Sequence, residues 1–207
     1  MSKPYYEENG ITIYHGDCRE ILPTLPKVDL VLTDPPYGIL SKGSAHIRRF
    51  NKNIGRGDVH WDIAPSKATL QALMVVGRKA MIWGGNNFDL GPTFGWLIWD
   101  KQNDGLNFGE CEYCWTNMKF APRIHRERCI NIDNAREHPT QKPKNLMIRC
   151  IQMDVDLPST ILDPFMGSGT TLRAAKDLGR KAIGIEIEEK YCEIAAKRLS
   201  QEVFDFK

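Results

Sequence analysis

The chain has 207 residues and a mass of 23.6 kDa, a size typical of one α/β domain. Its 28 Lys and Arg residues nearly balance 26 Asp and Glu residues, so the formal net charge of +2 neither indicates nor excludes an acidic partner. No apolar run reaches the roughly 18 residues of a membrane span, and the first ten residues lack the apolar part of a secretory signal. We therefore expect a cytoplasmic protein with no membrane partner.

Six cysteines are scattered through the chain, a pattern more typical of reduced thiols than of a disulfide framework. Cys111 and Cys114 form a CxxC, which can be half of a zinc site. Without a second CxxC or a spaced pair of histidines, buried thiols are favoured and no metal site is predicted.

The first predicted strand covers 11–18, and a short helix or turn follows over 18–26. A second strand, over the apolar run VDLVL at 28–32, leads into TDPPYG at 33–38. Two consecutive prolines cannot continue a sheet ladder, because each lacks the N–H that a neighbouring strand needs. The strand therefore ends at Asp34, and an acid, two prolines and an aromatic ring at that point indicate a binding site.

The segment 39–65 is polar and shows no steady hydrophobic period. Loops of this length are usually functional or mobile. Its basic side chains favour contacts with nucleic-acid phosphates, although a solvated loop without a binding role is the alternative. The candidate phosphate-binding residues are Lys42, Arg48, Arg49, Lys52 and Arg56.

Further along the chain, helices are predicted over 66–77 and 143–155, the first with a serine cap and the second with Pro143 in its first turn. Strands are predicted over 79–85, 95–101 and 111–118, and two strand-turn-helix units follow from residue 159 onward. This alternation predicts an α/β fold with an open, largely parallel sheet that helices cover on both faces.

A glycine turn in the first of these units places Gly167 and Gly169 between a β-branched strand and a helix that begins near Thr170. Glycines allow the backbone to approach a ligand closely, and the helix N-terminus presents unpaired N–H groups. The turn lacks the third glycine of the dinucleotide fingerprint and the GK[ST] ending of a phosphate loop. Phosphate binding is therefore disfavoured.

Glu186 ends the next strand, 17 residues beyond Gly169. Doubly wound folds hold the hydroxyl groups of a ribose with an acid at about this place. The favoured ligand is thus a nucleoside without an essential phosphate. The alternatives are a solvated acid at Glu186 and a simple strand-helix connection at the glycine turn.

Three motifs in order, DPPY at 34–37, HPTQKP at 138–143 and FMGSGTT at 165–171, resemble those of the β class of amino-group DNA methyltransferases. The resemblance extends over nearly the whole chain. It implies a Rossmann-like methyltransferase fold, mostly parallel and doubly wound, with one antiparallel edge strand and a permuted order in which the catalytic motif precedes the cofactor motif. It also implies S-adenosylmethionine as cofactor, S-adenosylhomocysteine as product and DNA as partner.

The resemblance further implies a single methyltransferase domain over 1–207, with 39–65 as a mobile target-recognition loop. Asp17 and Cys18 would border the adenine of the cofactor, Glu186 would bind its ribose, and residues 140–142 would close over its methionine end. A proline-bracketed loop leading into a helix is the alternative for residues 138–143. The implied cofactor-binding residues are Asp17, Cys18, Thr140, Gln141, Lys142, Asp163, Phe165, Gly167, Ser168, Gly169, Thr170 and Glu186.

The implied catalytic residues are Asp34, Pro35, Pro36 and Tyr37. The exocyclic nitrogen of adenine is a poor nucleophile because its lone pair is delocalised into the ring. The Asp34 carboxylate and the Pro35 carbonyl would each accept one N–H of that amino group, which directs the lone pair at the methyl carbon. Tyr37 would stack on a base flipped out of the duplex, a contact worth about 1–3 kcal/mol.

The residue before ProProTyr is Asp, whereas cytosine-N4 members of the family more often have Ser there. By this resemblance, adenine is favoured over cytosine as the target base. The alternatives are a cytosine-N4 or RNA methyltransferase, and a catalytically silent nucleic-acid-binding module of the same fold. Relatives from restriction-modification systems often carry a separate recognition domain, for which this chain has no segment of sufficient size. A short target, a homodimer that shares the recognition, or a single-stranded substrate would each fit that difference.

Overall fold

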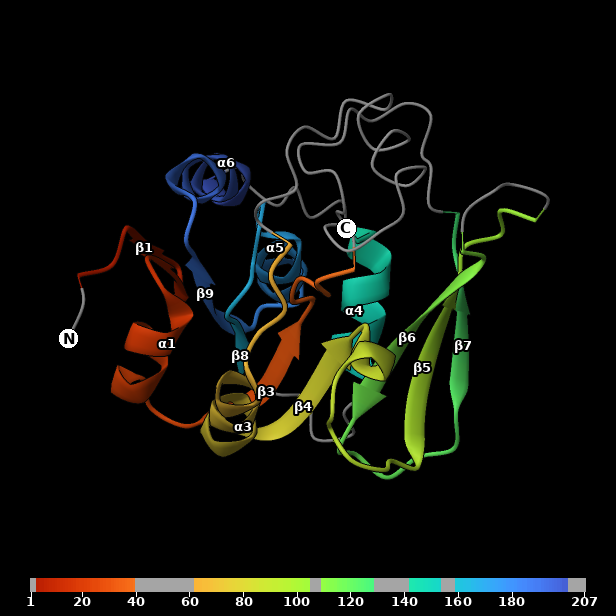
Figure 1. Ribbon diagram of the computed structural model, residues 1–207. Coiled ribbons are helices and arrows are strands. Elements are labelled where there is room, and N and C mark those ends of the chain that lie inside the picture. The colour runs from red at the N-terminus through yellow and green to blue at the C-terminus, as the bar shows by residue number, and fades with distance from the viewer. Residues whose placement is uncertain (1–2, 40–61, 105–108, 129–141, 154–158, 201–207) are drawn as a thin grey trace.

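The computed structural model describes residues 3–39, 62–104, 109–128, 142–153 and 159–200. A nine-stranded sheet runs through the described part in the order β1-β2-β9-β8-β3-β4-β6-β5-β7 (Figure 1). The strands are β1 (Tyr6–Glu8), β2 (Ile11–His15), β3 (Val28–Thr33), β4 (Gly77–Trp83), β5 (Gly95–Asp100), β6 (Cys111–Thr116), β7 (Arg123–Arg126), β8 (Thr160–Asp163) and β9 (Lys181–Glu186).

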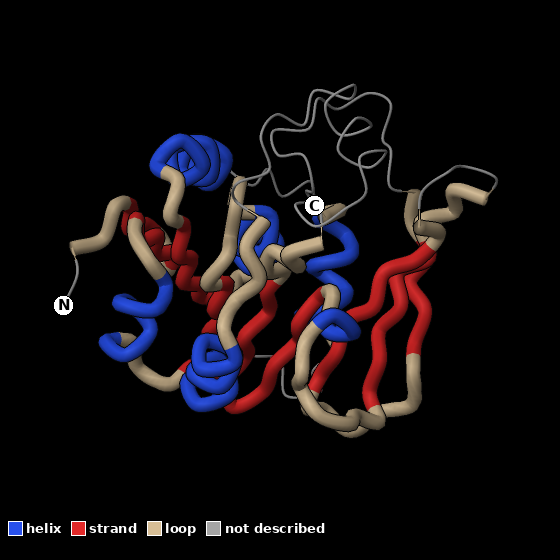
Figure 2. Tube along the Cα trace, in the orientation of Figure 1, coloured by secondary structure: helices blue, strands red, loops and turns tan. Residues whose placement is uncertain are grey.

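Helices cover both faces of this sheet (Figure 2). They are α1 (Cys18–Ile21), α3 (Lys67–Val76), α4 (Lys144–Gln152), α5 (Thr170–Asp177) and α6 (Glu189–Ser200), with short 3₁₀ helices η1 (Leu22–Thr24) and η2 (Gly85–Asn87). None of the described helices is long and apolar enough to cross a membrane.

Strand β3 shows why the sheet needs two helical layers. Side chains alternate between the two faces of a strand. Leu30 and Leu32 belong to the core formed with α4, α5 and α6, whereas Val31 belongs to the core formed with α1 and α3. All three side chains are fully buried, as expected for a central strand of a doubly wound sheet.

Strand directions confirm a mostly parallel sheet with an antiparallel edge strand. Strands β2, β9, β8, β3 and β4 pair in parallel, and β1 pairs antiparallel with β2 at one edge. Strand β6 adds a second antiparallel strand inside the sheet, between β4 and β5, and β7 at the other edge is parallel to β5.

The sequence patterns locate the central elements but miss both edge strands. Strand β1 has three residues, and β7 consists of the segment RIHR, so neither shows an apolar alternation. The predicted caps are confirmed, because the Ser66 hydroxyl accepts a hydrogen bond from the Thr69 amide at 3.1 Å and Pro143 precedes the first turn of α4.

Candidate active site

The DPPY motif and the glycine turn begin at the same edge of the sheet. Strands β3 and β8 are parallel neighbours, and their last residues, Thr33 and Asp163, are joined by a hydrogen bond. The Thr33 hydroxyl donates to Asp163 Oδ1 at 2.8 Å, in the protein interior. In open α/β sheets, ligands bind beyond the carboxyl ends of the strands, where these two motifs meet.

One pocket lies between the two motifs. It is lined by Asp34, Lys142, Met147, Asp163, Phe165, Met166, Gly167, Ser168, Thr170 and Thr171. Seven of these are among the residues selected from the sequence, and they come from segments more than 100 residues apart. The pocket therefore places the candidate catalytic acid next to the candidate cofactor turn.

The Asp34 carboxylate has a donor on each oxygen. The Tyr37 hydroxyl donates to Oδ1 at 2.6 Å, and the Lys142 ammonium donates to Oδ2 at 2.5 Å. Burial raises the pKa of Asp34, Lys142 lowers it, and the charge of Glu112 raises it further. Asp34 is thus a half-buried acid that one neighbouring cation helps to keep ionised.

Lys142 lies between two carboxylates and is 6% exposed. Its ammonium is 2.5 Å from Asp34 Oδ2 and 2.9 Å from Glu112 Oε2. Burial alone would lower the pKa of Lys142, but Asp34, Tyr37 and Glu112 together raise it well above the ordinary value. The predicted role at the methionine end of the cofactor stays a prediction for Lys142, while Thr140 and Gln141 lie outside the described residues.

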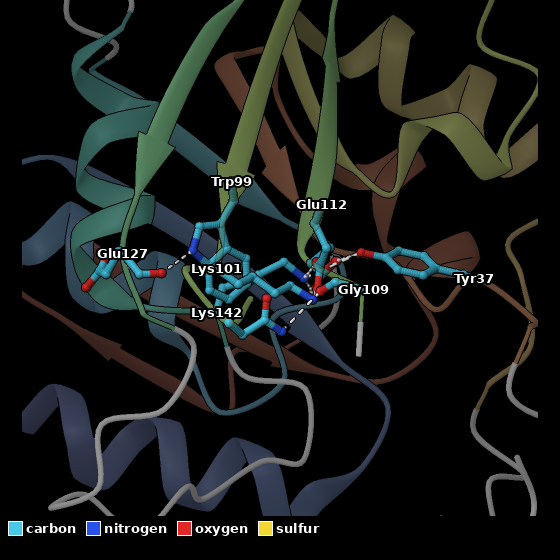
Figure 3. Close-up of polar contacts among 9 residues, drawn as sticks. Tyr37, Trp99, Lys101, Gly109, Glu112, Glu127 and Lys142 are labelled. Atoms are coloured by element: carbon cyan, nitrogen blue, oxygen red, sulfur yellow. Dashed lines mark hydrogen bonds and ion pairs between the residues drawn. The ribbon is translucent and has the colours of Figure 1, made fainter. Parts of the chain in front are cut away.

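The sequence analysis did not find Glu112, which lies on β6 (Figure 3). Its Oε1 is 2.6 Å from the Lys101 ammonium, and its Oε2 is close to Lys142. Burial raises the pKa of Glu112, but the two ammonium groups outweigh it and lower the pKa to about 2. The available signal in the sequence was an acid among the mostly apolar residues of CEYCW. Only the pairing of β6 in the sheet shows that this acid faces Lys101 and Lys142.

Tyr37 packs against backbone that only glycine can form. Gly84 has a φ of 65°, and a Cβ built on it would lie 2.1 Å from Tyr37 Cε1. The ring also meets Phe88 edge-on at 6.1 Å between centroids. The chain after β4 therefore fixes the aromatic ring of the DPPY motif.

We expect Gly84→Ala to reduce methyl transfer by about 10- to 100-fold, because displacing Tyr37 removes a stacking contact worth roughly 1–3 kcal/mol. Gly179→Ala is the matched control, since Gly179 has the same φ of 65° but no atom within 4 Å of its Cβ position. Steady-state rates and thermal melts are measured for both variants. Together they distinguish displacement of the Tyr37 ring, which only Gly84→Ala causes, from backbone strain, which both variants share. Equal loss of activity in the two variants would contradict the role of Gly84.

The glycine turn is held by Glu186. Oε2 of Glu186 accepts from the Gly167 amide and Oε1 from the Glu188 amide, each at 2.9 Å. Burial raises the pKa of Glu186, and these two hydrogen bonds partly offset the rise. Glu186 thus stands at the cofactor turn, as predicted, although its contact with a ribose stays a prediction.

Gly169 faces α6 rather than the pocket. Its φ is 78°, and a Cβ there would lie 2.8 Å from the Cβ of Ala195. This glycine is therefore needed for the close approach of α6, and its contact with the cofactor stays a prediction.

Asp17 and Cys18 reach the same sheet edge through β2. His15 pairs with Glu186 in the β2–β9 ladder, and the Gly16 amide donates to the Glu186 carbonyl at 2.9 Å. The Asp17 carboxylate caps α1 and pairs with Arg19. Neither Asp17 nor Cys18 lines the pocket described above, so their place beside the cofactor's adenine stays a prediction.

The predicted phosphate-binding residues Lys42, Arg48, Arg49, Lys52 and Arg56 lie outside the described residues. The described chain on either side is joined, because the Gly38 amide donates to Asp62 Oδ1 at 2.9 Å. This contact lies directly after Tyr37, the last residue of the DPPY motif. The role of residues 39–65 as a recognition loop stays a prediction.

The CxxC cysteines lie on one strand. Residues three apart in a strand point to opposite faces, and accordingly Cys114 is buried while Cys111 is half-buried. The two thiols therefore cannot bind one ion together in this strand. No cluster of metal-binding side chains occurs among the described residues.

The pocket has the chemical character that S-adenosylmethionine requires. Asp163 offers a carboxylate to a cationic centre, and Ser168, Thr170 and Thr171 offer hydroxyl groups. Phe165, Met147 and Met166 supply apolar surface. Side chains of all three kinds match a ligand that combines a sulfonium, polar groups and a purine.

A model of the N6/N4 family described as DNA methylase matches residues 81–197, more than half of the chain. The chain belongs to the DNA methylase family. Methyltransferases of this family use S-adenosylmethionine. The predicted family, fold and cofactor are thereby confirmed.

Three similar proteins support this assignment for the methylase. Type II methyltransferase M.HinfI of Haemophilus influenzae is 28% identical, over 92% of this chain and 68% of its own length. Type II methyltransferase M2.DpnII of Streptococcus pneumoniae is 29% identical, over 98% of this chain and 94% of its own length. The crystal structure of the M1.HpyAVI–SAM complex superposes with a TM-score of 0.59 at 26% identity, covering 92% of this chain and all of that one.

The alignment with M2.DpnII is longer than the methylase itself. It matches 98% of the 207 residues, about 203, over 255 positions, so about 50 positions of the relative have no counterpart here. The expected lack of a separate recognition domain stays a prediction.

Proposed function

We propose that this methylase transfers a methyl group from S-adenosylmethionine to the exocyclic N6 of an adenine flipped out of DNA. The observation that carries the proposal is the single pocket lined by both Asp34 and the glycine turn. A methyl group can pass directly between two sites only where they share one enclosed space. The Asp-Pro-Pro-Tyr sequence favours adenine over cytosine, by resemblance.

Each residue of the DPPY motif has a distinct task in the proposed reaction. The charged carboxylate of Asp34 accepts a hydrogen bond from one N–H of the amino group. The Pro35 carbonyl accepts a hydrogen bond from the other N–H. Because consecutive prolines restrict the backbone, little reorganisation is left for the transition state. Tyr37 supplies the face on which the base stacks, offsetting part of the few kcal/mol that flipping costs.

When bound, S-adenosylmethionine would supply a methyl group on a positively charged sulfur, and that sulfur would keep the bonding electron pair as the methyl group passes to the amino nitrogen. The nitrogen then loses one proton, which passes to Asp34 or to solvent. The buried carboxylate of Asp163 favours a cation in the pocket before transfer. No covalent bond to the protein is needed.

The test is to incubate the protein with unmethylated DNA and isotopically labelled S-adenosylmethionine, digest the DNA to nucleosides and identify the labelled base by mass spectrometry. We expect N6-methyladenine. N4-methylcytosine would establish the cytosine alternative, and label in a parallel RNA sample alone would establish RNA as substrate.

A binding module without activity would leave every sample unlabelled. Cofactor stabilisation gives an independent readout, because a ligand at about 100 times its Kd adds about 2.7 kcal/mol of stability. For a chain of this size that corresponds to a rise of roughly 5–10 °C in melting temperature. A homodimer stays a prediction, which sedimentation of the protein with and without DNA measures.

A further inference from the structure

Both oxygens of Asp34 already have a donor in this structure. The Tyr37 hydroxyl is 2.6 Å from Oδ1 and the Lys142 ammonium is 2.5 Å from Oδ2. A target amino group that is to donate to this carboxylate must therefore displace one of these donors or share its oxygen. Lys142 is the stronger competitor, since its hydrogen bond joins two opposite charges.

The Lys142 ammonium cannot move into solvent at low cost. Its side chain is 5% exposed and lies 5.7 Å from the centroid of the Trp83 ring and 5.9 Å from that of Tyr37. A buried ammonium without a carboxylate partner carries a large desolvation penalty. Release of Asp34 therefore requires a second acid within reach of the same ammonium.

Glu112 is placed as that second acid. Its Oε2 lies 2.9 Å from the Lys142 ammonium but accepts no well-aligned hydrogen bond from the described part of the chain. Its other oxygen, Oε1, is held by Lys101 at 2.6 Å. A small rotation of the Lys142 side chain can thus exchange a short contact with Asp34 for a hydrogen bond with Glu112.

Charges of alternating sign form a row here, from Lys101 through Glu112 to Lys142 (Figure 3). The Lys142 ammonium continues the row to Asp34. Opposite charges in a row at these distances, on side chains that are 5–25% exposed, are coupled to one another. A change at Lys101 therefore reaches Asp34 through two intervening side chains.

We propose that Glu112 is a positioning residue of methyl transfer, which receives the Lys142 ammonium when the target amino group takes its place on Asp34, and that Lys101 keeps Glu112 in position. This inference rests on the proposed function, because it concerns how the amino group gains access to Asp34. Neither residue needs to contact the base or the cofactor.

The titratable and charged groups that surround Asp34 come from five parts of the fold. They are Tyr37 after β3, Lys101 after β5, Glu112 and Cys114 on β6, Lys142 before α4 with Cys150 on it, and Asp163 at the end of β8. Burial raises the pKa values of Tyr37, Cys114 and Cys150 to about 12 or well above their ordinary range, so these three stay neutral. Below neutral pH, protonation of Asp34 and of Asp163 changes the charge of the group.

The experiment compares Glu112→Gln with Lys101→Met, because the two substitutions change the row in opposite directions. Glu112→Gln removes a negative neighbour of Asp34, so Asp34 should become protonated at a lower pH. The acidic limb of the pH–rate profile, where the rate of methyl transfer falls as the pH is lowered, should therefore move to lower pH. Lys101→Met removes a positive charge, so the limb should move to higher pH. We expect shifts on the order of one pH unit, by the size of ordinary charge effects on pKa.

The maximal single-turnover rate of Glu112→Gln should also fall by about tenfold or more, since Lys142 then has only Asp34 as an ionised partner. Rates are measured from about pH 5 to about pH 9 at saturating S-adenosylmethionine, so that protonation of Asp163 affects cofactor occupancy least. Glu112→Asp keeps the charge and should leave the limb near that of the unmodified protein. Glu110→Gln, the same charge change on an exposed neighbouring residue, should leave both rate and limb unchanged.

A purely structural role would give a different pattern. If both main variants lose activity without a shift of the acidic limb, or if both limbs move in the same direction, the positioning role of Glu112 is wrong. The methyl-transfer activity of the unmodified protein tests the proposed function separately from the role of Glu112. Cofactor-induced stabilisation of each variant shows that the fold and the cofactor pocket are retained.

Discussion

Asp34→Ala should lower the rate of methyl transfer by about three orders of magnitude, the loss typical of removing a preorganised group that acts in the transition state. In the proposed reaction the side chain supplies the charged acceptor for the target amino group. Among the described residues, the nearby carboxylates already have partners, and that of Asp62 accepts from the Gly38 amide. Glu112 lies behind Lys142, and Asp163 is bonded to Thr33 and to the Phe165 amide. Neither can replace Asp34 without moving a buried partner.

The same variant should bind S-adenosylmethionine within about threefold of the unmodified affinity, since uniform binding of the cofactor depends on the glycine turn. Lys142 stays paired through Glu112, so the fold should be retained. Asp89→Ala is a suitable control, because Asp89 is exposed and pairs only with Lys67 among its described contacts. Comparable turnover by Asp34→Ala and the unmodified protein would disprove the catalytic role.

Asp163→Asn should make the protein more stable at neutral pH while weakening cofactor binding. Asp163 is 3% exposed, and burial raises its pKa from 3.8 to about 6, although hydrogen bonds from Thr171, Thr33 and Phe165 oppose the rise. A carboxyl whose folded pKa is raised contributes most to stability below its unfolded pKa. That contribution is lost as the pH rises through about 6.

Ionised Asp163 thus costs up to about 3 kcal/mol above this range, because each pKa unit corresponds to about 1.4 kcal/mol. A neutral amide removes most of that cost, so the melting temperature should rise by roughly 5–10 °C at about pH 8. The gain should shrink between about pH 6 and pH 4, where the parent carboxyl becomes protonated. Melting curves over this range, with the exposed Asp104→Asn as control, measure it.

The affinity of Asp163→Asn for S-adenosylmethionine should fall by about tenfold, because stability gained at a functional acid is usually lost in function. Calorimetric titration of the folded variant gives the Kd directly. A gain of stability that is equal at all pH values would show that packing, and not the charge of Asp163, is responsible. An unchanged Kd would remove Asp163 from the cofactor site.

Local sequence patterns were sufficient for the central part of the fold. The apolar run of β3, the prolines that end it and the glycines before α5 each act over a few residues, so a local pattern determines them. The edge strands β1 and β7 were missed for the complementary reason. Each has a sheet partner on one side only, and their side chains are mostly exposed, so no hydrophobic pattern marks them.

The sequence by itself predicted the two ends of the candidate active site, because Asp34 and Gly167 lie in motifs whose residue types follow from their proposed chemistry, and the fold brings both to one pocket. Only the tertiary structure decided what holds Asp34. The pairing of β6 with β4 and the entry of the chain into α4 bring Glu112 and Lys142 together from 30 positions apart in the chain. Interactions between charges depend on distance and burial, which a linear sequence does not contain, so the row of charges behind the catalytic acid became visible only in the folded protein.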